Sequence, residues 1–305
     1  MTSEPILLLA FNRPVEFAQV VDRLRVVAPS TIYVAVDGPR AGHPTDAENV
    51  ARTRAVVESI DWPCTVTTLF REENLGCGLG VSGAISWFLE HEERGIILED
   101  DILPQPTFFE FCTELLDRYQ DDPRVLAVSG CNFVPPEELE QQAPYRFSRV
   151  PHIWGWATWR RAWETYSWDI EGWERKLPPA RLWRATGRSL AGYLHWKTLF
   201  DLMARHQIDT WDFQLVFAGM ANDALTATSN INLVDNIGWG AGATHTADRP
   251  SYLRPSEPMA LPVADVPVAV DERADRWSRR VVFGATFPGL VRGGFRYLKA
   301  RVGRK

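Results

Sequence analysis

The sequence lacks the patterns that mark several common protein classes. Its four cysteines have no paired short spacing, which excludes a zinc-binding motif and the disulfide framework of a small secreted protein. No run approaches the roughly 20 apolar residues of a membrane span, and the opening residues do not form a signal peptide. We therefore expect a protein of the cytoplasm.

Acidic residues are absent from the last part of the chain. Residues 276–305 hold nine Arg or Lys and no Asp or Glu; since the whole chain has a net charge of −6, the preceding residues carry −15. This acidic body argues against a general nucleic-acid binder. Aromatic and aliphatic side chains lie between the charges of the tail. That pattern fits either peripheral contact with the inner face of an anionic membrane or a C-terminal helix packed on the body.

The rest of the chain alternates short apolar runs with amphipathic segments. Apolar runs without helical period predict buried strands, and apolar side chains three or four residues apart predict helices. Strands are expected at 5–11, 31–36, 65–70, 96–98 and 125–129, and helices at 17–27, 47–60, 80–91 and 107–119. This alternation predicts an α/β fold with a mainly parallel, Rossmann-like sheet covered by helices on both faces.

Three consecutive carboxylates, Glu99-Asp100-Asp101, follow one of the expected strands. Like charges at a strand end need a positive partner, and hard oxygen ligands suit Mg²⁺ or Mn²⁺. The alternative is a solvated acidic turn before Pro104, and the triplet alone does not decide between the two.

Two other expected strands also end in polar residues, Asn12-Arg13 and Asp37-Gly38. Ligands of parallel sheets bind beyond the carboxyl ends of the strands, so these residues and the carboxylate triplet can converge on one ligand. Phosphate-binding glycine motifs are weak, because the glycine-rich segment 76–80 lacks the Lys-Ser/Thr of a P-loop and the context of a dinucleotide fingerprint. A cation at the triplet is the better means of holding a diphosphate.

Tryptophan is concentrated in the second half of the chain. Nine of the 13 tryptophans lie between Trp154 and Trp211. Core packing accounts for most of them, but an indole face can also stack on the apolar face of a sugar ring. Trp154-Gly155-Trp156 follows Pro151 in an expected loop, so we expect at least one of these two indoles to face a ligand.

Seven short segments follow one another in a specific order between Pro5 and His245. They are Phe11-Asn12-Arg13, Val36-Asp37-Gly38, Ile97-Leu98-Glu99-Asp100-Asp101-Ile102, Phe108-Phe109-Glu110-Phe111, Val128-Ser129-Gly130-Cys131-Asn132, Ile153-Trp154-Gly155-Trp156 and Thr210-Trp211-Asp212. In this order they resemble the GT-A-fold glycosyltransferases, specifically the N-acetylglucosaminyltransferase I type and its bacterial relatives. A Glu-Asp-Asp alone is common, whereas the ordered series is specific.

The resemblance implies a metal-dependent, inverting glycosyltransferase. It would move a sugar from a nucleoside diphosphate sugar, expected to be UDP-linked, to a hydroxyl of a glycan or glycolipid acceptor in surface polysaccharide synthesis. Nucleotide or donor contacts are implied for Asn12, Arg13, Asp37, Gly38, Arg71, Asn74, Glu99 and Asp100. The stretch 71–82 departs from the animal pattern, which leaves the base and the sugar open.

The same resemblance implies the remaining roles. Asp101 would bind Mn²⁺ or Mg²⁺ directly, and His245, at the end of the glycine-rich segment 236–245, would be a second metal or phosphate contact. Asp212 would be the general base that deprotonates the acceptor hydroxyl; its alternative role is to cap the helix that follows. Acceptor contacts are implied for Trp154, Trp156, Trp211 and Trp239.

We expect one catalytic domain over residues 1–245. Its nucleotide-sugar-binding half would be 1–132 and its acceptor-binding half 133–245, followed by a Pro-rich strap at 246–275 and a basic amphipathic segment at 276–305.

Two other functions stay open. A sugar nucleotidyltransferase is disfavoured because Phe11-Asn12-Arg13-Pro14 lacks the glycines of that signature. The other is a non-catalytic, tryptophan-rich carbohydrate-binding protein.

Overall fold

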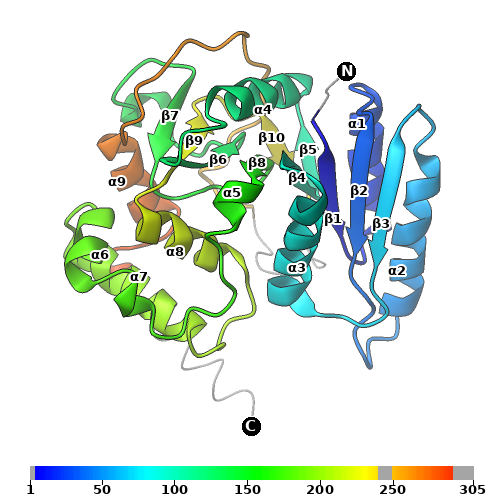
Figure 1. Cartoon of the computed structure of the whole chain (residues 1–305), viewed down its shortest axis with the longest axis horizontal. Helices are drawn as coiled ribbons and strands as arrows, with labels where there is room; N and C mark the ends of the chain where they lie inside the picture. Colours follow the sequence, from blue (N-terminus) through cyan, green and yellow to red (C-terminus); the bar gives the residue numbers. More distant parts are fainter. Residues whose placement is uncertain (1–3, 240–248, 291–305) are drawn as a thin grey trace.

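An eight-stranded sheet forms the centre of the computed structural model, which describes residues 4–239 and 249–290 (Figure 1). Its strand order is β3-β2-β1-β4-β8-β6-β9-β7. The strands are β1 Ile6–Ala10, β2 Thr31–Val36, β3 Thr65–Phe70, β4 Arg94–Glu99, β6 Val125–Ser129, β7 Tyr145–Ser148, β8 Trp156–Trp159 and β9 Leu225–Ser229. All run in one direction except β7 and β8, which pair antiparallel to their neighbours. The mainly parallel, Rossmann-like α/β sheet is therefore confirmed.

Helices cover both faces of the first four strands. The helices of this half are α1 Pro14–Arg25, α2 Asp46–Ala55, α3 Gly76–His91 and α4 Pro106–Arg118. Helices α1 and α2 pack together on one face, and α3 lies on the other (Figure 1). This arrangement follows from right-handed crossovers: the chain moves outward through β2 and β3, and then returns across β1 to form β4.

The second half adds short helices and antiparallel strands. Its helices are α5 Arg160–Trp163, α6 Pro179–Ala185, α7 Leu190–Met203, α8 Asp212–Asn222 and α9 Glu272–Val281. A separate two-stranded ribbon pairs β5 Ile102–Pro104 with β10 Val234–Asn236. The main apolar core extends from Ile6 in β1 to Val263, so both halves share it, and a smaller core lies between α6, α7 and α8.

The segment before α9 crosses the surface without regular structure and is tied to α4. The amide of Met259 donates to the Thr107 hydroxyl at 3.1 Å, and the amide of Val263 donates to Glu114 at 3.1 Å. Helix α9 then begins at Glu272, where the Asp271 carboxylate caps it. The boundary expected at 275/276 is therefore wrong, because it falls inside this helix. No helix in the two described ranges is long and apolar enough to cross a bilayer.

Candidate functional site

A cleft of about 990 Å³ opens at the carboxyl ends of β1, β2 and β4. The strand order reverses between β1 and β4, and open α/β sheets bind their ligands at such a reversal. Ten of the residues implied by the sequence line the cleft: Asn12, Arg13, Asp37, Arg71, Asn74, Glu99, Asp100, Asp101, Trp154 and Trp239. The sheet thus brings together side chains that are up to 227 positions apart in the sequence.

The carboxylate triplet at the end of β4 meets a guanidinium. Arg13 Nη1 donates to Asp101 Oδ2 at 2.6 Å and lies 3.7 Å from Asp100 Oδ1. The second oxygen of Asp100 accepts the amide of Phe11 at 3.1 Å. Arg13 therefore supplies part of the positive charge that the sequence analysis assigned to a metal ion.

One guanidinium does not balance three carboxylates. Burial raises the pKa of Glu99, Asp100 and Asp101, and repulsion within the triplet raises the pKa of the first two further. Asp101 Oδ1 is also buried without a hydrogen-bond partner. An unpartnered carboxylate oxygen amid excess negative charge fits a hard divalent cation.

The described residues supply only part of a cation's coordination shell. Within the described ranges, no three His, Cys, Asp or Glu side chains form a cluster that could hold a metal. A cation at Asp101 would therefore complete its shell with water or with ligand phosphates, as Mg²⁺ commonly does. The second ligand suggested by the sequence, His245, lies outside the described residues.

Asp37 organises the cleft wall at the end of β2. Its carboxylate accepts from Asn74 Nδ2 at 3.0 Å, from the amide of Leu75 at 3.1 Å and from the amide of Gly38 at 3.0 Å. Gly38 does not line the cleft, because a Cβ there would lie 2.4 Å from the main chain of Glu73. Gly38 therefore permits close packing of this turn on Glu73, and a donor contact of its main chain stays a prediction.

Asp46 and Arg40 form a charged pair at the cleft wall that the sequence did not indicate. The buried Asp46 carboxylate accepts from Arg40 Nε at 2.6 Å and from Asn12 Nδ2 at 2.9 Å. The hydrogen bond from Arg40 holds the pKa of Asp46 well below its usual range. The guanidinium carbon of Arg40 lies 5.3 Å from the centre of the Phe11 ring. A second fixed cation therefore faces the cleft.

Asp209 was also missed, and it joins the two halves across the cleft. Its carboxylate accepts from the amides of Cys77 at 3.1 Å and Gly78 at 2.8 Å, in the first turn of α3. A Cβ on Gly78 would lie 2.0 Å from the Trp168 ring. The glycine-rich start of α3 thus serves close packing and capping by a carboxylate, which also agrees with the helix dipole.

Asp212 is the first residue of α8 and is not among the residues that line the cleft. Its carboxylate accepts a hydrogen bond from the Thr210 hydroxyl. It lies near enough to the triplet for its charge to contribute to the raised pKa of Glu99. The residue at the capping position of α8 is Trp211, so the alternative role of Asp212 as the cap is wrong.

The four candidate tryptophans divide into two pairs. Trp154 and Trp239 line the cleft, with ring centres 5.6 Å apart in an edge-to-face arrangement. Trp156 and Trp211 are buried and stack on each other at 5.6 Å. The acceptor contacts implied for Trp156 and Trp211 are therefore wrong, because neither indole presents a face to a ligand. Trp156 is the first residue of β8, whereas Trp154 and Gly155 lie in a loop, as expected.

Comparison with known proteins gives distant likenesses only. No family model matches the sequence, and no curated protein matches it. Among solved structures, the chain is similar to HddC from Yersinia pseudotuberculosis at 11% identity, over 39% of this chain and 55% of that chain, with a TM-score of 0.27. The chain therefore spans about half of the length of that protein.

A second solved structure is similar over more of the chain. It is mouse xyloside xylosyltransferase 1 in its apo form, at 11% identity, over 72% of this chain and 81% of that chain, with a TM-score of 0.33. At such TM-scores neither likeness decides the fold or the activity. The functional proposal below therefore rests on the residues of the cleft.

Proposed function

We propose that the chain is a metal-dependent, inverting glycosyltransferase that uses a nucleoside diphosphate sugar, UDP-linked. The acceptor would be a hydroxyl of a glycan or glycolipid in surface polysaccharide synthesis. The main support for this proposal is the carboxylate triplet. Its negative charge is only partly neutralised by Arg13, and it lines a cleft of about 990 Å³ where the strand order reverses. That volume accommodates a nucleotide sugar, since ligand pockets commonly span about 300–1,000 Å³.

The chain's own residues would bind and orient the donor. Asp101 would hold Mn²⁺ or Mg²⁺, which would neutralise charge that builds on the leaving diphosphate, and Asp100 would contact the donor. Arg13 and Arg40 face the same cleft, and both are already fixed by carboxylates, so a diphosphate would meet preorganised positive charge. Asn74, which donates to Asp37, would contact the nucleoside.

An inverting transfer also needs one base. The acceptor oxygen attacks the anomeric carbon, the bond to the diphosphate oxygen breaks, and the hydroxyl proton passes to a carboxylate. Asp212 is our candidate, because its charge reaches Glu99 of the triplet and its carboxylate is oriented by the Thr210 hydroxyl. Asp209 is the weaker candidate, because both of its oxygens already accept main-chain amides of α3.

Three variants test the proposal with a panel of nucleoside diphosphate sugars, using nucleoside diphosphate release and transfer to added glycans as readouts. Asp101→Ala should lose metal-dependent donor binding. Asp212→Asn should bind the donor normally and lose transfer by at least about a hundredfold, a typical contribution of a general base. Asp209→Asn is the matched control and should retain transfer.

If Asp212→Asn retains transfer and Asp209→Asn loses it, the general base is Asp209 and not Asp212. Sugar nucleotide synthesis from a sugar phosphate and a nucleoside triphosphate would instead indicate the nucleotidyltransferase. Glycan binding that is indifferent to EDTA and nucleotide would indicate a carbohydrate-binding protein.

A further inference from the structure

Two stretches without acidic residues meet at α6, the start of α7 and residues 276–290. In the sequence, residues 177–200 and 276–290 contain no Asp or Glu, although the chain as a whole has a net charge of −6. We call the exposed residues of these two stretches the basic face. Figure 1 shows α6, α7 and α9 gathered at the end of the molecule opposite α2.

Side-chain contacts join the two stretches into one surface. Arg279 in α9 donates from Nη1 to the carbonyl of Thr186, between α6 and α7, at 3.0 Å. A Cβ on Gly192, in the first turn of α7, would lie 2.8 Å from the side chain of Arg279. Beyond α9, the ring of Phe283 packs on Trp196 of α7 at 5.4 Å. The end of α9 is therefore docked on the turn between α6 and α7.

Four arginines of the basic face have no ionic partner. Arg184, Arg188, Arg276 and Arg280 are exposed, and none forms an ion pair with another residue in the described part of the chain. The other arginine of α9 on the outer surface, Arg273, pairs with Glu138 at 3.3 Å. Arg276 still feels the charge of Glu272 one turn earlier on α9, but none of the four guanidinium groups is held in an ion pair, which favours an anionic partner.

Apolar side chains are exposed on the same face. Of the ten large hydrophobic residues exposed in the described ranges, five belong to it: Trp183, Leu190, Leu194, Val281 and Phe287. Leu190 and Leu194 are four residues apart on α7, so they lie on one side of that helix. Exposed leucine and tryptophan beside unpaired arginine suit the interface of a bilayer, where indoles and basic side chains settle at the headgroups.

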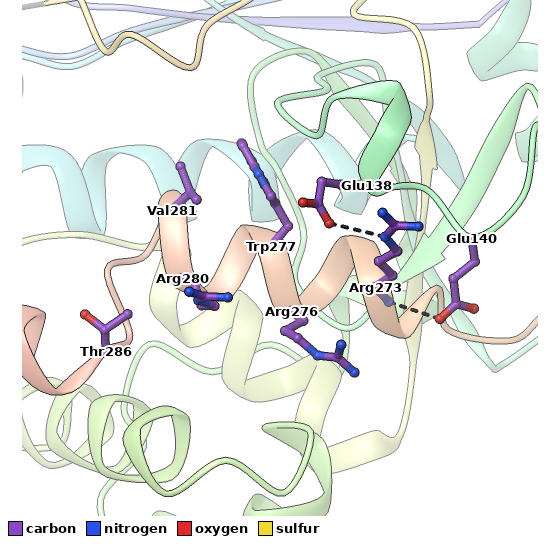
Figure 2. A pocket seen from close by; sticks show the side chains of 8 residues that line it. All are labelled: Glu138, Glu140, Arg273, Arg276, Trp277, Arg280, Val281 and Thr286. Carbon is purple, nitrogen blue, oxygen red and sulfur yellow. Dashed lines mark hydrogen bonds and ion pairs between the residues drawn. The ribbon is translucent and has the colours of Figure 1, made fainter.

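A pocket beside α9 adds room for a headgroup. It has a volume of about 660 Å³, and Arg276 and Arg280 line it, four residues apart along one side of the helix (Figure 2). At its other end, Glu138 pairs with the side chain of Arg273, and Glu140 accepts the amide of Arg273. Three arginines and two glutamates line the pocket, so its net charge is positive.

We propose that the basic face binds the surface of an anionic phospholipid bilayer, with phosphate headgroups at the four arginines and the exposed indole and leucines at the acyl boundary. This binding surface includes α6 and α7, and is therefore broader than the C-terminal tail. The proposal does not depend on the glycosyltransferase activity. It concerns only the contact between the basic face and a membrane.

Vesicle sedimentation of the full chain tests the proposal. The probes are vesicles of phosphatidylcholine alone and vesicles with one third phosphatidylglycerol. The variant Arg184→Gln/Arg188→Gln removes two charges from α6 and the turn after it, and leaves the tail intact. The matched control, Arg52→Gln/Arg254→Gln, removes two exposed arginines that lie on α2 and in the segment before α9, and that form no ion pair with described residues.

The wild type should bind the anionic vesicles and not the neutral ones. Each arginine near the membrane surface contributes about fivefold to the binding constant, so the α6 variant should bind roughly thirtyfold more weakly, and the control should bind as the wild type does. Unchanged melting temperatures would show that both variants are folded. Equal binding by the two variants, or no binding of the wild type to anionic vesicles, would overturn the proposal.

Discussion

At the scale of single residues, charge placement defines the cleft. Three buried carboxylates share the guanidinium of Arg13, and a second carboxylate–arginine pair, Asp46 with Arg40, fixes another cation at the same wall. A buried charge is tolerated only where partners compensate it. The remaining imbalance at the triplet is the feature that calls for a cation.

Residue identities at strand ends were predictable, but their partners were not. Arg13, Asp37 and Asp101 follow apolar runs, and a parallel sheet gathers such positions at one edge. Asp209 lies 131 positions from Gly78, and no local pattern links a loop carboxylate to the first turn of a distant helix. Trp156 and Trp211 were misplaced because an indole suits a core and a sugar site equally well.

His152 gives a prediction on pH. Its ring is buried between Phe133 and Phe283, and burial lowers its pKa to about 3 from 6.5, with a smaller contribution from Arg146. The unfolded chain takes up this proton below pH 6.5 and the folded chain does not, so the free energy of unfolding falls as the pH falls through that window. Between pH 7 and pH 5 the loss from this residue should be about 2 kcal/mol.

Urea unfolding of wild type and His152→Phe at the two pH values measures this contribution. The variant should lose about 2 kcal/mol less stability on acidification than the wild type. An identical loss in both proteins would show that His152 is not held neutral in the folded state.

At the scale of elements, the start of α3 connects the two halves. Its amides are capped by Asp209, and Gly78 lets the Trp168 ring pack against the helix. The periodicity of apolar residues predicted a helix only from residue 80, whereas α3 begins at Gly76. The earlier start depends on a cap from the other half, which local propensity does not contain.

Substituting alanine for two glycines of α3 distinguishes the effect of side-chain packing on stability from the effect of helix propensity. Gly78→Ala should destabilise the protein by about 1–3 kcal/mol, because its Cβ would meet Trp168 at 2.0 Å. Gly83→Ala should be neutral or stabilising by up to about 1 kcal/mol, because only the flexible end of Arg71 is near, at 3.1 Å. Thermal unfolding measures both changes, and equal effects would contradict the packing role of Gly78.

The strands show the same division between local and distant causes. β2, β3 and β6 have the predicted bounds: β2 and β6 are buried apolar runs, and β3 is a Thr-rich, partly exposed strand at the sheet edge. β8 was not predicted: it is four residues long, and it inserts antiparallel between β4 and β6, which only the assembled sheet makes favourable. Short strands of this kind depend on their neighbours more than on their own sequence.

At the scale of the whole molecule, two surfaces carry distinct chemistry. The cleft concentrates buried negative charge with fixed arginines at the reversal of strand order, and the basic face concentrates unpaired arginines with exposed apolar side chains. Together, the two proposals describe an enzyme that would bind a nucleoside diphosphate sugar in the cleft and meet a membrane-bound acceptor with the basic face.

The most direct test of the cleft is a thermal shift with UDP, GDP and CMP, each with and without Mn²⁺. A nucleotide at about one hundred times its dissociation constant stabilises the folded state by about 2.7 kcal/mol, which raises the melting temperature by roughly 4 °C for a chain of this size. We predict such a shift for one nucleoside diphosphate, with Mn²⁺ present and not without it, and its loss in Asp101→Ala. No shift with any nucleotide, with or without Mn²⁺, would contradict the account.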